Sequence, residues 1–369
     1  MTRFDLHILR RFFAATALLL GLLVVFFVVL DYVEYIDDFM DRGATLGEVF
    51  GTYYRNYVPE IVKLTSPLAV FLAAIYVTAR LSGTMQLTAL TMAGVSLYRF
   101  LVPFAFAGAL VTGFMLWFNG WVVPPANAVV LDFQQRYYRD APDAPETSDV
   151  YRQTAPGSVL AVGFYDPEQR QGFRVSLLDF AVDTTGGTLA PARLVRRLDA
   201  ETMGWDDSTA SWHLAEAVLH RFSADGRAQR VVLGELDTAL TVLPPDLARS
   251  ERDAERLTIP EARAYVASLE RAGASRIGRP LVEYHAKFAY PLANLILVLV
   301  GVSLAARRRR GGQAVQLALG LLVAFVYLAL QKVIEPFGYA EALPPALAAW
   351  LPHAVFAAAA LLLLLRAPK

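Results

Sequence analysis

The sequence predicts an α-helical membrane protein with six transmembrane helices, arranged three and three around an inserted all-β, jellyroll-like domain. Hydrophobic residues make up 56% of the 369-residue chain and charged residues only 18%, and the mean hydropathy is +0.40. This balance is more apolar than that of an ordinary soluble domain. The excess lies in long runs toward both ends of the chain, whereas the segment 132–287 has a soluble composition.

Six runs almost free of charge are close to the length that crosses the hydrocarbon core of a bilayer, about 20 residues of helix. They cover residues 12–30, 64–79, 100–131, 288–306, 311–331 and 342–365. The second run is short and contains Pro67, so we extend it back to about residue 58 and expect Lys63 to reach toward the nearer membrane surface. The first run is too long for the apolar part of a signal peptide, which favours an uncleaved helix.

Basic residues at alternate ends of these runs predict the orientation of the chain. They are Arg3, Arg10, Arg11, Arg80, Arg99, Arg307 to Arg310, Arg366 and Lys369. Loops rich in Lys and Arg stay in the cytoplasm. We therefore expect both termini to be cytoplasmic and the large insert to lie outside.

The insert has the pattern of an all-β domain followed by a helical return. Short segments of alternating polarity cover 158–166, 172–183, 189–202, 211–223 and 230–242. Turn residues bound them, and the pattern favours a sandwich or jelly roll. Thr258 and Glu261 suit a helix start, so we expect a helix over about 258–273. The resulting parts are 1–131, 132–282 and 283–369.

The sequence lacks the usual motifs of catalysis, so we expect no catalytic residue, no metal and no cofactor bound by this chain. It has neither the P-loop pattern nor the G-x-S-x-G turn. Its five histidines show no metal-ligand spacing. His213 and His220 are expected on opposite faces of one strand. The charge-free helix cores also argue against coupling to ions, which needs ionisable groups at mid-membrane.

The segment of about 82–94, between the second and third runs, is too short as a helix to cross a membrane. Met85, Ala89 and Met92 form one stripe of this helix, and Gly94 is expected to end it. A plain interfacial connector is the simplest interpretation. A short surface helix with an exposed apolar face is also the kind of element that docks into a groove on a partner.

Several segments together carry a resemblance to a known family. They are VPEIVKLTSPLAVFLAAIYVTARLS (58–82), MQLTALTMAGVSLYRF (85–100), NGWVVPPAN (119–127), and LTIPEARAYVASLERAGAS followed by EYHAKFAYPLANLILVLVGVSLA (283–305). They resemble the permeases of lipopolysaccharide export, LptF/LptG, nearly end to end, and AFVYLALQKV and ALPPALAAWLP favour the LptG side. The strand region matches only as a pattern.

This resemblance implies one permease of an ATP-binding-cassette transporter in the bacterial inner membrane. Such a permease pairs with a second, related permease and is driven by a separate cytoplasmic ATPase dimer, which uses the ATP. It passes lipopolysaccharide to a periplasmic bridge protein with a jellyroll fold, so the insert would be periplasmic. No nucleic-acid partner is expected.

In this family the segment 82–94 is the coupling helix that receives the motion of the ATPase. The matching positions here are Gln86, Leu87, Ala89, Leu90, Met92 and Gly94. Family members often carry glutamate where this chain has Gln86. An ion pair with the ATPase would then become a neutral hydrogen bond, which is typically weaker.

A phosphorylated sugar headgroup would need cations at the outer mouth of the helices, because guanidinium and ammonium groups bind phosphate. The candidates are Arg55, Lys63, Arg136, Arg139 and Lys332, with Lys287 at the same level. Arg136 and Arg139 have helical i, i+3 spacing, so both can face one headgroup. For each of these residues taken alone, a solvated or snorkelling charge is the first interpretation.

Two other classes of protein remain open. One is a four-span permease that extrudes lipoproteins or peptides, which needs one helix before the insert and three after it. The other is a membrane-anchored enzyme or scaffold whose β domain acts alone.

Overall fold

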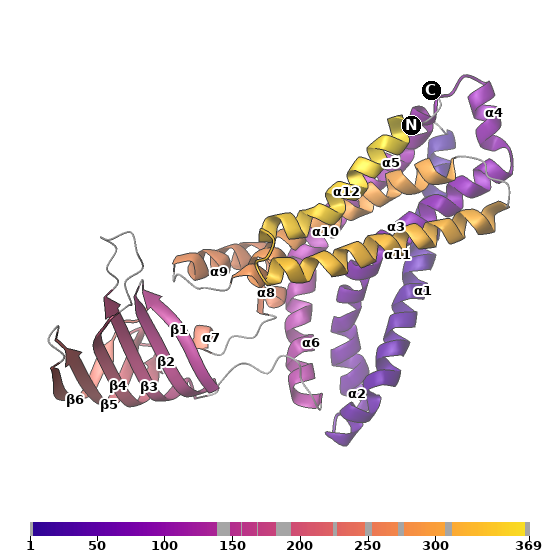
Figure 1. Ribbon diagram of the computed structural model, residues 1–369. Helices are drawn as coiled ribbons and strands as arrows, with labels where there is room; N and C mark the ends of the chain where they lie inside the picture. Colours follow the sequence, from indigo (N-terminus) through magenta and orange to yellow (C-terminus); the bar gives the residue numbers. More distant parts are fainter. Residues whose placement is uncertain are drawn as a thin grey trace. The chain divides into compact units, whose positions relative to one another are not determined.

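The computed structural model describes residues 3–138, 148–155, 157–167, 169–181, 193–223, 227–247, 253–271, 277–306 and 312–365 (Figure 1). The chain divides into two compact units, which we call the helical bundle and the sheet unit. The bundle comprises Met1–Ala141, Ala254–Arg263 and Gly278–Lys369, and the sheet unit comprises Pro142–Asp253 and Ala264–Ile277.

The bundle is built from helices that follow the predicted apolar runs. They are α1 (Arg3–Asp41), α2 (Leu46–Glu48), the π-helix η1 (Val49–Tyr54), α3 (Arg55–Gly83), α4 (Gln86–Met92), α5 (Leu97–Trp117), the π-helix η2 (Phe118–Val122), α6 (Val123–Tyr137), α10 (Gly278–Ala305), α11 (Gly312–Tyr339) and α12 (Pro345–Leu365). The short α8 (Asp253–Arg256) and α9 (Ile259–Arg271) precede α10.

Six helical stretches in the described residues are long and apolar enough to cross a membrane, three before the strands and three after them. The predicted fold class, a six-helix membrane protein with an inserted β domain, is therefore confirmed. The four-span alternative does not fit, because it has a single helix before the insert.

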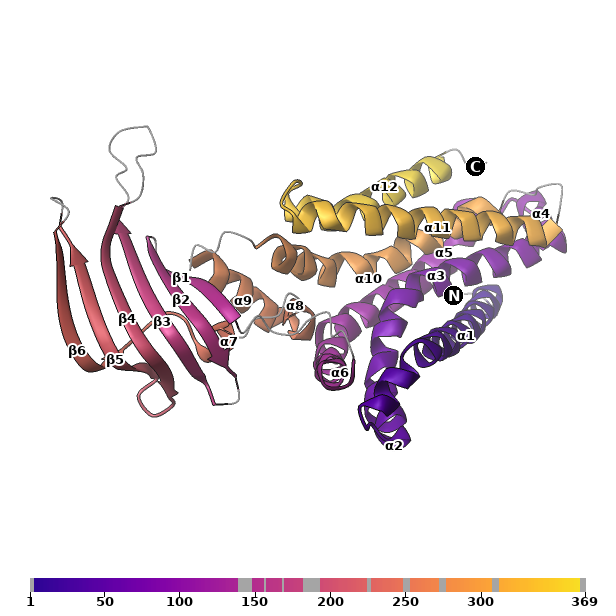
Figure 2. The same ribbon diagram turned by 60° about the horizontal axis from the view of Figure 1, so that its bottom comes forward.

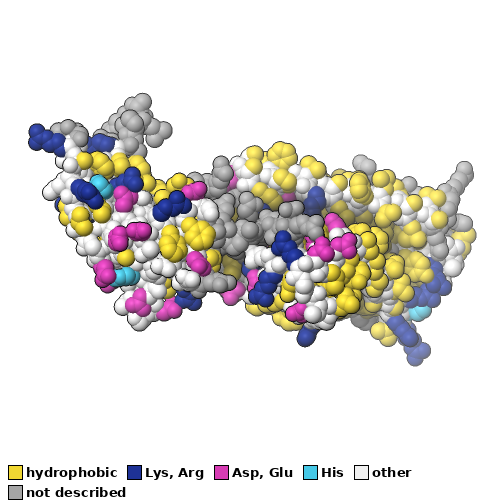
Figure 3. Space-filling model, turned by 90° about the horizontal axis from the view of Figure 1, so that it is seen from below, with side chains coloured by type: hydrophobic (Ala, Val, Ile, Leu, Met, Phe, Trp, Pro, Cys, Tyr) yellow, Lys and Arg dark blue, Asp and Glu magenta, His cyan; other side chains and the backbone are white. Residues whose placement is uncertain are grey.

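Helices α3 and α10 form the centre of the bundle, and both are mostly buried over their apolar windows. Small residues allow them to pack closely. A Cβ atom at Gly301 of α10 would lie 3.1 Å from the carbonyl oxygen of Phe71 on α3, which is closer than an ordinary van der Waals contact. Helix α1 differs, because none of its apolar window is buried. In Figure 3 the bundle presents a largely hydrophobic surface, as expected for a surface that faces lipid.

The sheet unit contains one antiparallel sheet. Its strands are β1 (Ser148–Ala155), β2 (Ser158–Asp166), β3 (Gln171–Ala181), β4 (Arg193–Asp206), β5 (Ser211–Phe222) and β6 (Ala228–Thr238), and each pairs with the next along the chain (Figure 2). The described strands therefore form a single up-and-down sheet, not the two packed sheets of a sandwich or jelly roll. Strand β1 is additional to the five predicted strands, because its apolar alternation is weak and only Val150 and Thr154 are buried.

A β-bulge in β5 changes which residues share a face. Glu216 has φ of 55°, and the pairing register shifts between Leu214 and Ala217. The extra residue places His213 and His220 on the same face, so the expectation of opposite faces is wrong. His213 Nδ1 lies 2.7 Å from Asp237 Oδ1, and this hydrogen bond raises the pKa of His213.

The opposite face of the sheet packs against the chain that follows β6. Trp212 is fully buried there, and its indole N–H donates a 2.7 Å hydrogen bond to the carbonyl of Val242. Val242 and Leu247, at the end of α7 (Pro244–Leu247), join the same apolar cluster. The cluster gives this single sheet a core of its own.

Replacing Trp212 with alanine should lower the free energy of unfolding of the sheet unit by about 3–5 kcal/mol, because a buried aromatic side chain and its hydrogen bond are lost together. His213→Ala, one residue along on the other face, should cost much less, because the side chain and its hydrogen bond are exposed to water. Denaturant unfolding of the purified chain, followed by tryptophan fluorescence and hydrogen exchange in β5, would measure both. Equal losses of unfolding free energy in the two variants would contradict the assignment of Trp212 and His213 to opposite faces of the sheet.

Candidate functional site

Helix α4 lies between α3 and α5, near the start of α1 and the end of α12 (Figure 1). The hydroxyl of Tyr98, at the start of α5, donates a 3.0 Å hydrogen bond to the carbonyl of Leu364 in α12. Several helix ends therefore meet beside α4.

Helix α4 is shorter than the predicted 82–94, because α3 continues through Gly83. The Thr84 hydroxyl then donates a 2.9 Å hydrogen bond to the carbonyl of Arg80. Met85 adopts a left-handed conformation with φ of 60°, which separates the two helices. Gly94 has φ of 80° and turns the chain after α4, in the conformation that glycine adopts without strain.

The six predicted coupling residues fall on two different faces. Leu87 is only 7% exposed and belongs to an apolar cluster with residues of α1, α3 and α5, and Leu90 packs against the same cluster. Met92 is 84% exposed. The remaining three, Gln86, Ala89 and Gly94, are also exposed. Leu87 and Leu90 therefore attach α4 to the bundle, and Met92 lies on the face left open.

Helix α1 is fixed at the same place by a buried carboxylate. Asp5, 3% exposed, accepts two hydrogen bonds from the guanidinium of Arg99 at 2.9 and 2.7 Å. Such a bidentate pair fixes both the separation and the relative orientation of the two side chains. Ile8 and Phe12, one and two turns further along α1, pack in the cluster that contains Leu87. The start of α1 and the buried face of α4 therefore share one apolar cluster.

An apolar cavity of about 720 Å³ opens between α1 and α11, over α3. Its walls come from one face of each helix: Arg11, Ala14, Ala15, Leu18, Leu19, Leu72, Tyr76, Val77, Arg80, Leu317, Ala318 and Leu321. Most of these side chains are aliphatic, so the cavity suits hydrocarbon. Phe12 of α1 and Leu87 of α4 belong to one apolar cluster, so the helix that lines the cavity shares a core with α4.

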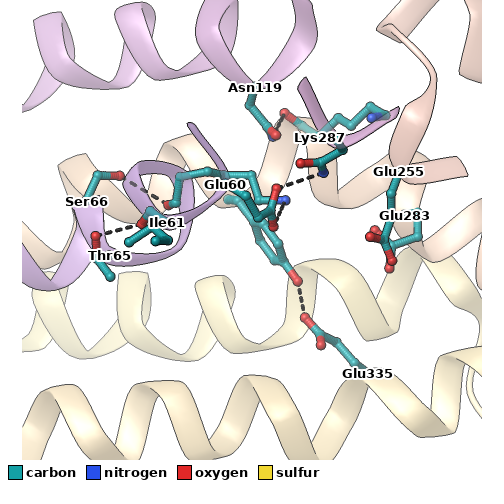
Figure 4. A network of polar contacts seen from close by, with 12 residues as sticks. Glu60, Ile61, Thr65, Ser66, Asn119, Glu255, Glu283, Lys287 and Glu335 are labelled. Carbon is teal, nitrogen blue, oxygen red and sulfur yellow. Dashed lines mark hydrogen bonds and ion pairs between the residues drawn. The ribbon is translucent and has the colours of Figure 1, made fainter. Parts of the chain in front are cut away.

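Far from α4, polar side chains gather inside the bundle (Figure 4). Glu60 lies about 33 Å along α3 from Ser82, given a rise of 1.5 Å per residue. Its carboxylate pairs with Lys63 at 2.5 Å and accepts a 2.9 Å hydrogen bond from the Asn127 amide of α6. Lys63 is thus paired with Glu60 within the bundle; that it reaches toward the nearer membrane surface stays a prediction.

A second group of polar contacts joins α10 to α11. Glu335, 5% exposed, accepts hydrogen bonds from Tyr290 and from Gln331, and it pairs with Lys332 at 3.2 Å. Glu283 accepts a 2.8 Å hydrogen bond from Tyr339. These contacts satisfy carboxylates that would otherwise be costly to bury.

The sequence analysis did not predict this polar network, although the spacing of charged residues could have indicated it. Oppositely charged residues occur at helical i, i+3 or i, i+4 spacing where three apolar runs begin or end: Glu60 and Lys63, Glu283 and Lys287, and Lys332 and Glu335. Charges paired in this way within a helix are able to stay inside a bundle.

The predicted headgroup cations do not form one cluster of free charges. Lys63 and Lys332 both pair with carboxylates. Lys287 is 6% exposed. Arg55 and Arg136 are exposed. Arg139 lies outside the described residues.

Removing Lys63 alone should leave the half-buried Glu60 without its cation. We expect Lys63→Met to lower the free energy of unfolding by about 3 kcal/mol, since breaking one half of a buried ion pair is more costly than replacing both. Glu60→Gln combined with Lys63→Met should recover most of this loss. Thermal unfolding in detergent would compare the two, and a double variant as unstable as the single one would contradict the pairing.

Comparison with known families gives one result of nearly full length. Residues 6–366 match the family model described as "Lipopolysaccharide export system permease LptF/LptG". None of the curated proteins compared with the chain matches it. The family match spans both units, including the sheet unit that resembles the family only as a pattern.

Proposed function

The chain belongs to the LptF/LptG family of lipopolysaccharide export permeases, and we propose that it is one of two permease subunits driven by a separate ATPase. The observation that carries the proposal is the path from α4 to the cavity. The open face of α4 offers Met92 to a partner, its buried face contacts Phe12 through the cluster around Leu87, and α1 lines the cavity beyond.

The cavity supports a role in moving acyl chains. Keeping a methylene group out of water is worth about 0.8 kcal/mol, so shielding several acyl chains is worth tens of kcal/mol. An apolar surface between α1 and α11 provides that shielding. A second, related permease placed against the exposed side of α1 would close the space, because α1 buries none of its own apolar window.

The sheet unit extends the proposal to the periplasm. An antiparallel sheet with a core on one face leaves two edge strands, β1 and β6, whose backbone groups are able to pair with strands of another protein. We propose that the sheet unit passes lipopolysaccharide to a periplasmic bridge protein of jellyroll fold. In this scheme ATP is used by the partner ATPase dimer, and this chain binds no cofactor.

The orientation proposed from the basic residues places α4 in the cytoplasm and the sheet unit in the periplasm. The chain has no cysteine. A single introduced cysteine is therefore the only site on the chain that a maleimide can label. In spheroplasts a membrane-impermeant maleimide should label T209C, in an exposed turn before β5. It should label T91C, exposed on α4, only after permeabilisation. Labelling of T91C before permeabilisation and of T209C only after it would show the opposite orientation in the membrane.

Met92→Asp should uncouple the ATPase from transport. Because Met92 is exposed, the change places a charge on the docking face without disturbing the core. We expect lipopolysaccharide-stimulated ATP hydrolysis by the co-purified complex to fall about tenfold, the effect of losing ~1.4 kcal/mol of interaction. Gln86→Ala should have a smaller effect, since it removes at most one neutral hydrogen bond.

Leu46→Asp is the matched control, since Leu46 is 54% exposed and lies beyond the other end of α1. It should leave ATP hydrolysis unchanged. Unaltered ATPase association and hydrolysis in the Met92 variant would contradict docking at α4. Purification of the chain with neither an ATPase nor a second permease would favour the membrane-anchored scaffold.

A further inference from the structure

The end of α1 remote from α4 carries an excess of negative charge that the transport of a phosphorylated lipid leaves unexplained. Between residues 31 and 57 the chain has six acidic residues and two arginines. Asp31 follows Arg11 on α1 by 20 residues, or about 30 Å at 1.5 Å per residue. Because this length matches the hydrocarbon core of a bilayer, Asp31 lies near the outer membrane boundary in the proposed orientation. The acidic residues there would repel a bare phosphate.

Asp31 differs from the other acidic residues of this stretch because its side chain is buried, with only 7% exposed. The hydroxyl of Tyr53 donates a 3.3 Å hydrogen bond to Asp31 Oδ1, whereas Oδ2 is buried without a hydrogen-bond partner. In the part of the chain that the structure describes, no lysine or arginine pairs with this carboxylate. A buried carboxylate oxygen without a donor is costly, so Oδ2 is suited to a cationic donor from outside the chain.

A second buried oxygen lies close to the same carboxylate. The hydroxyl of Tyr54, on η1, is near Asp31 and has no hydrogen-bond partner. The Tyr54 side chain is only 4% exposed. A primary ammonium group has three N–H donors, so a single ammonium is able to donate to both the carboxylate and the hydroxyl.

Tyr54 also belongs to a group of three aromatic rings. The ring centroids of Tyr32, Phe50 and Tyr54 lie 5.5 to 6.4 Å from one another. Phe50 is 53% exposed, Tyr32 is half-buried and Tyr54 is buried, so the rings lead from the surface toward the Tyr54 hydroxyl. The face of an aromatic ring attracts a cation within about 6 Å. The carboxylate and the rings therefore favour the same kind of ligand.

We propose that Asp31 binds a primary ammonium group on the lipopolysaccharide headgroup, with the Tyr54 hydroxyl as the second acceptor and the rings of Tyr32 and Phe50 beside it. This inference rests on the proposed transport of lipopolysaccharide, and it narrows the preferred cargo to headgroups whose phosphate carries an amine. A hydrogen bond between an ammonium group and a carboxylate is stronger than a neutral one, and partial exclusion of water strengthens it further.

An amine-bearing phosphate suits this end of the bundle better than a bare phosphate or a metal ion. The ammonium group offsets one negative charge of the phosphate that carries it, which lowers the repulsion by the acidic residues of α1. Arg55 follows Tyr54 directly and is exposed, so a cation for the phosphate lies on the same stretch of helix. For a metal ion, the described residues bring no three His, Cys, Asp or Glu side chains together.

The test is the binding of two lipopolysaccharides by the purified membrane complex in nanodiscs of phosphatidylglycerol, a lipid without an ammonium group. The two lipopolysaccharides share their sugars and acyl chains, and one carries phosphoethanolamine on its headgroup. The wild type should bind the substituted form about tenfold more tightly, which corresponds to ~1.4 kcal/mol. Asp31→Asn keeps the size of the side chain and removes its charge, so it should make the two dissociation constants equal.

Two further variants locate the effect. Asp37→Asn is the matched control, since Asp37 is an exposed carboxylate on the same helix; it should keep the preference for the substituted form. Tyr54→Phe keeps the ring and removes the hydroxyl, so it should reduce the preference less than Asp31→Asn does. The ratio of two dissociation constants does not depend on the fraction of folded protein, so the comparison holds even if the Asp31 variant is less stable.

An unchanged preference in Asp31→Asn, or an equal loss of preference in Asp37→Asn, would overturn the proposal. Phosphatidylethanolamine at equal concentration should not displace the substituted lipopolysaccharide; displacement would assign the site to a phospholipid and contradict the proposal. The preference should also persist in a chelator, because its loss there would make a divalent cation the occupant. Equal binding of both lipopolysaccharides by the wild type contradicts this inference alone, whereas binding of neither contradicts the proposed function as well.

Discussion

Close packing of α3 against α10 is the contact on which the other helices depend. Gly301 lets the backbone of α10 approach Phe71, and a Cβ atom added there would be in tight contact with α3. Helix α10 also packs on α5 and α12, and α3 carries α1 and α11. In a bilayer, where burial of apolar surface gives little advantage between helices, such tight van der Waals contact is the main source of association.

The same arrangement determines where the bundle is rigid and where it is open. Carboxylates of α3, α10 and α11 that are wholly or partly buried have partners at one end, as Glu60 has in Lys63 of its own helix and in Asn127 of α6. At the other end α1 is held by the Asp5 pair and by the cluster that contains Phe12. Next to that cluster, α1 and α11 each contact α3 but leave a cavity between them, which extends from Arg11 to Leu19 along α1. The cavity therefore lies on the α4 side of the bundle, and the polar contacts lie at the opposite end.

Composition and charge were enough to predict the six helices and the inserted β domain, because long apolar runs and alternate basic loops depend only on local sequence. Three features needed the structure. The single sheet depends on which strands pair, and the common face of His213 and His220 depends on a bulge that strict alternation does not reveal. The cavity joins Arg11 to Arg80 across sixty-eight intervening positions, and only the packing of α1 on α3 brings them together.

The left-handed residue between α3 and α4 has a mechanical consequence. A continuous helix from α3 would transmit any push along its axis, and the bend at Met85 prevents this. Helix α4 is instead held to the bundle at the buried Leu87, and its exposed end is at Met92. In the proposed coupling, a force on Met92 would turn α4 about Leu87 and would not pull α3 away from α10.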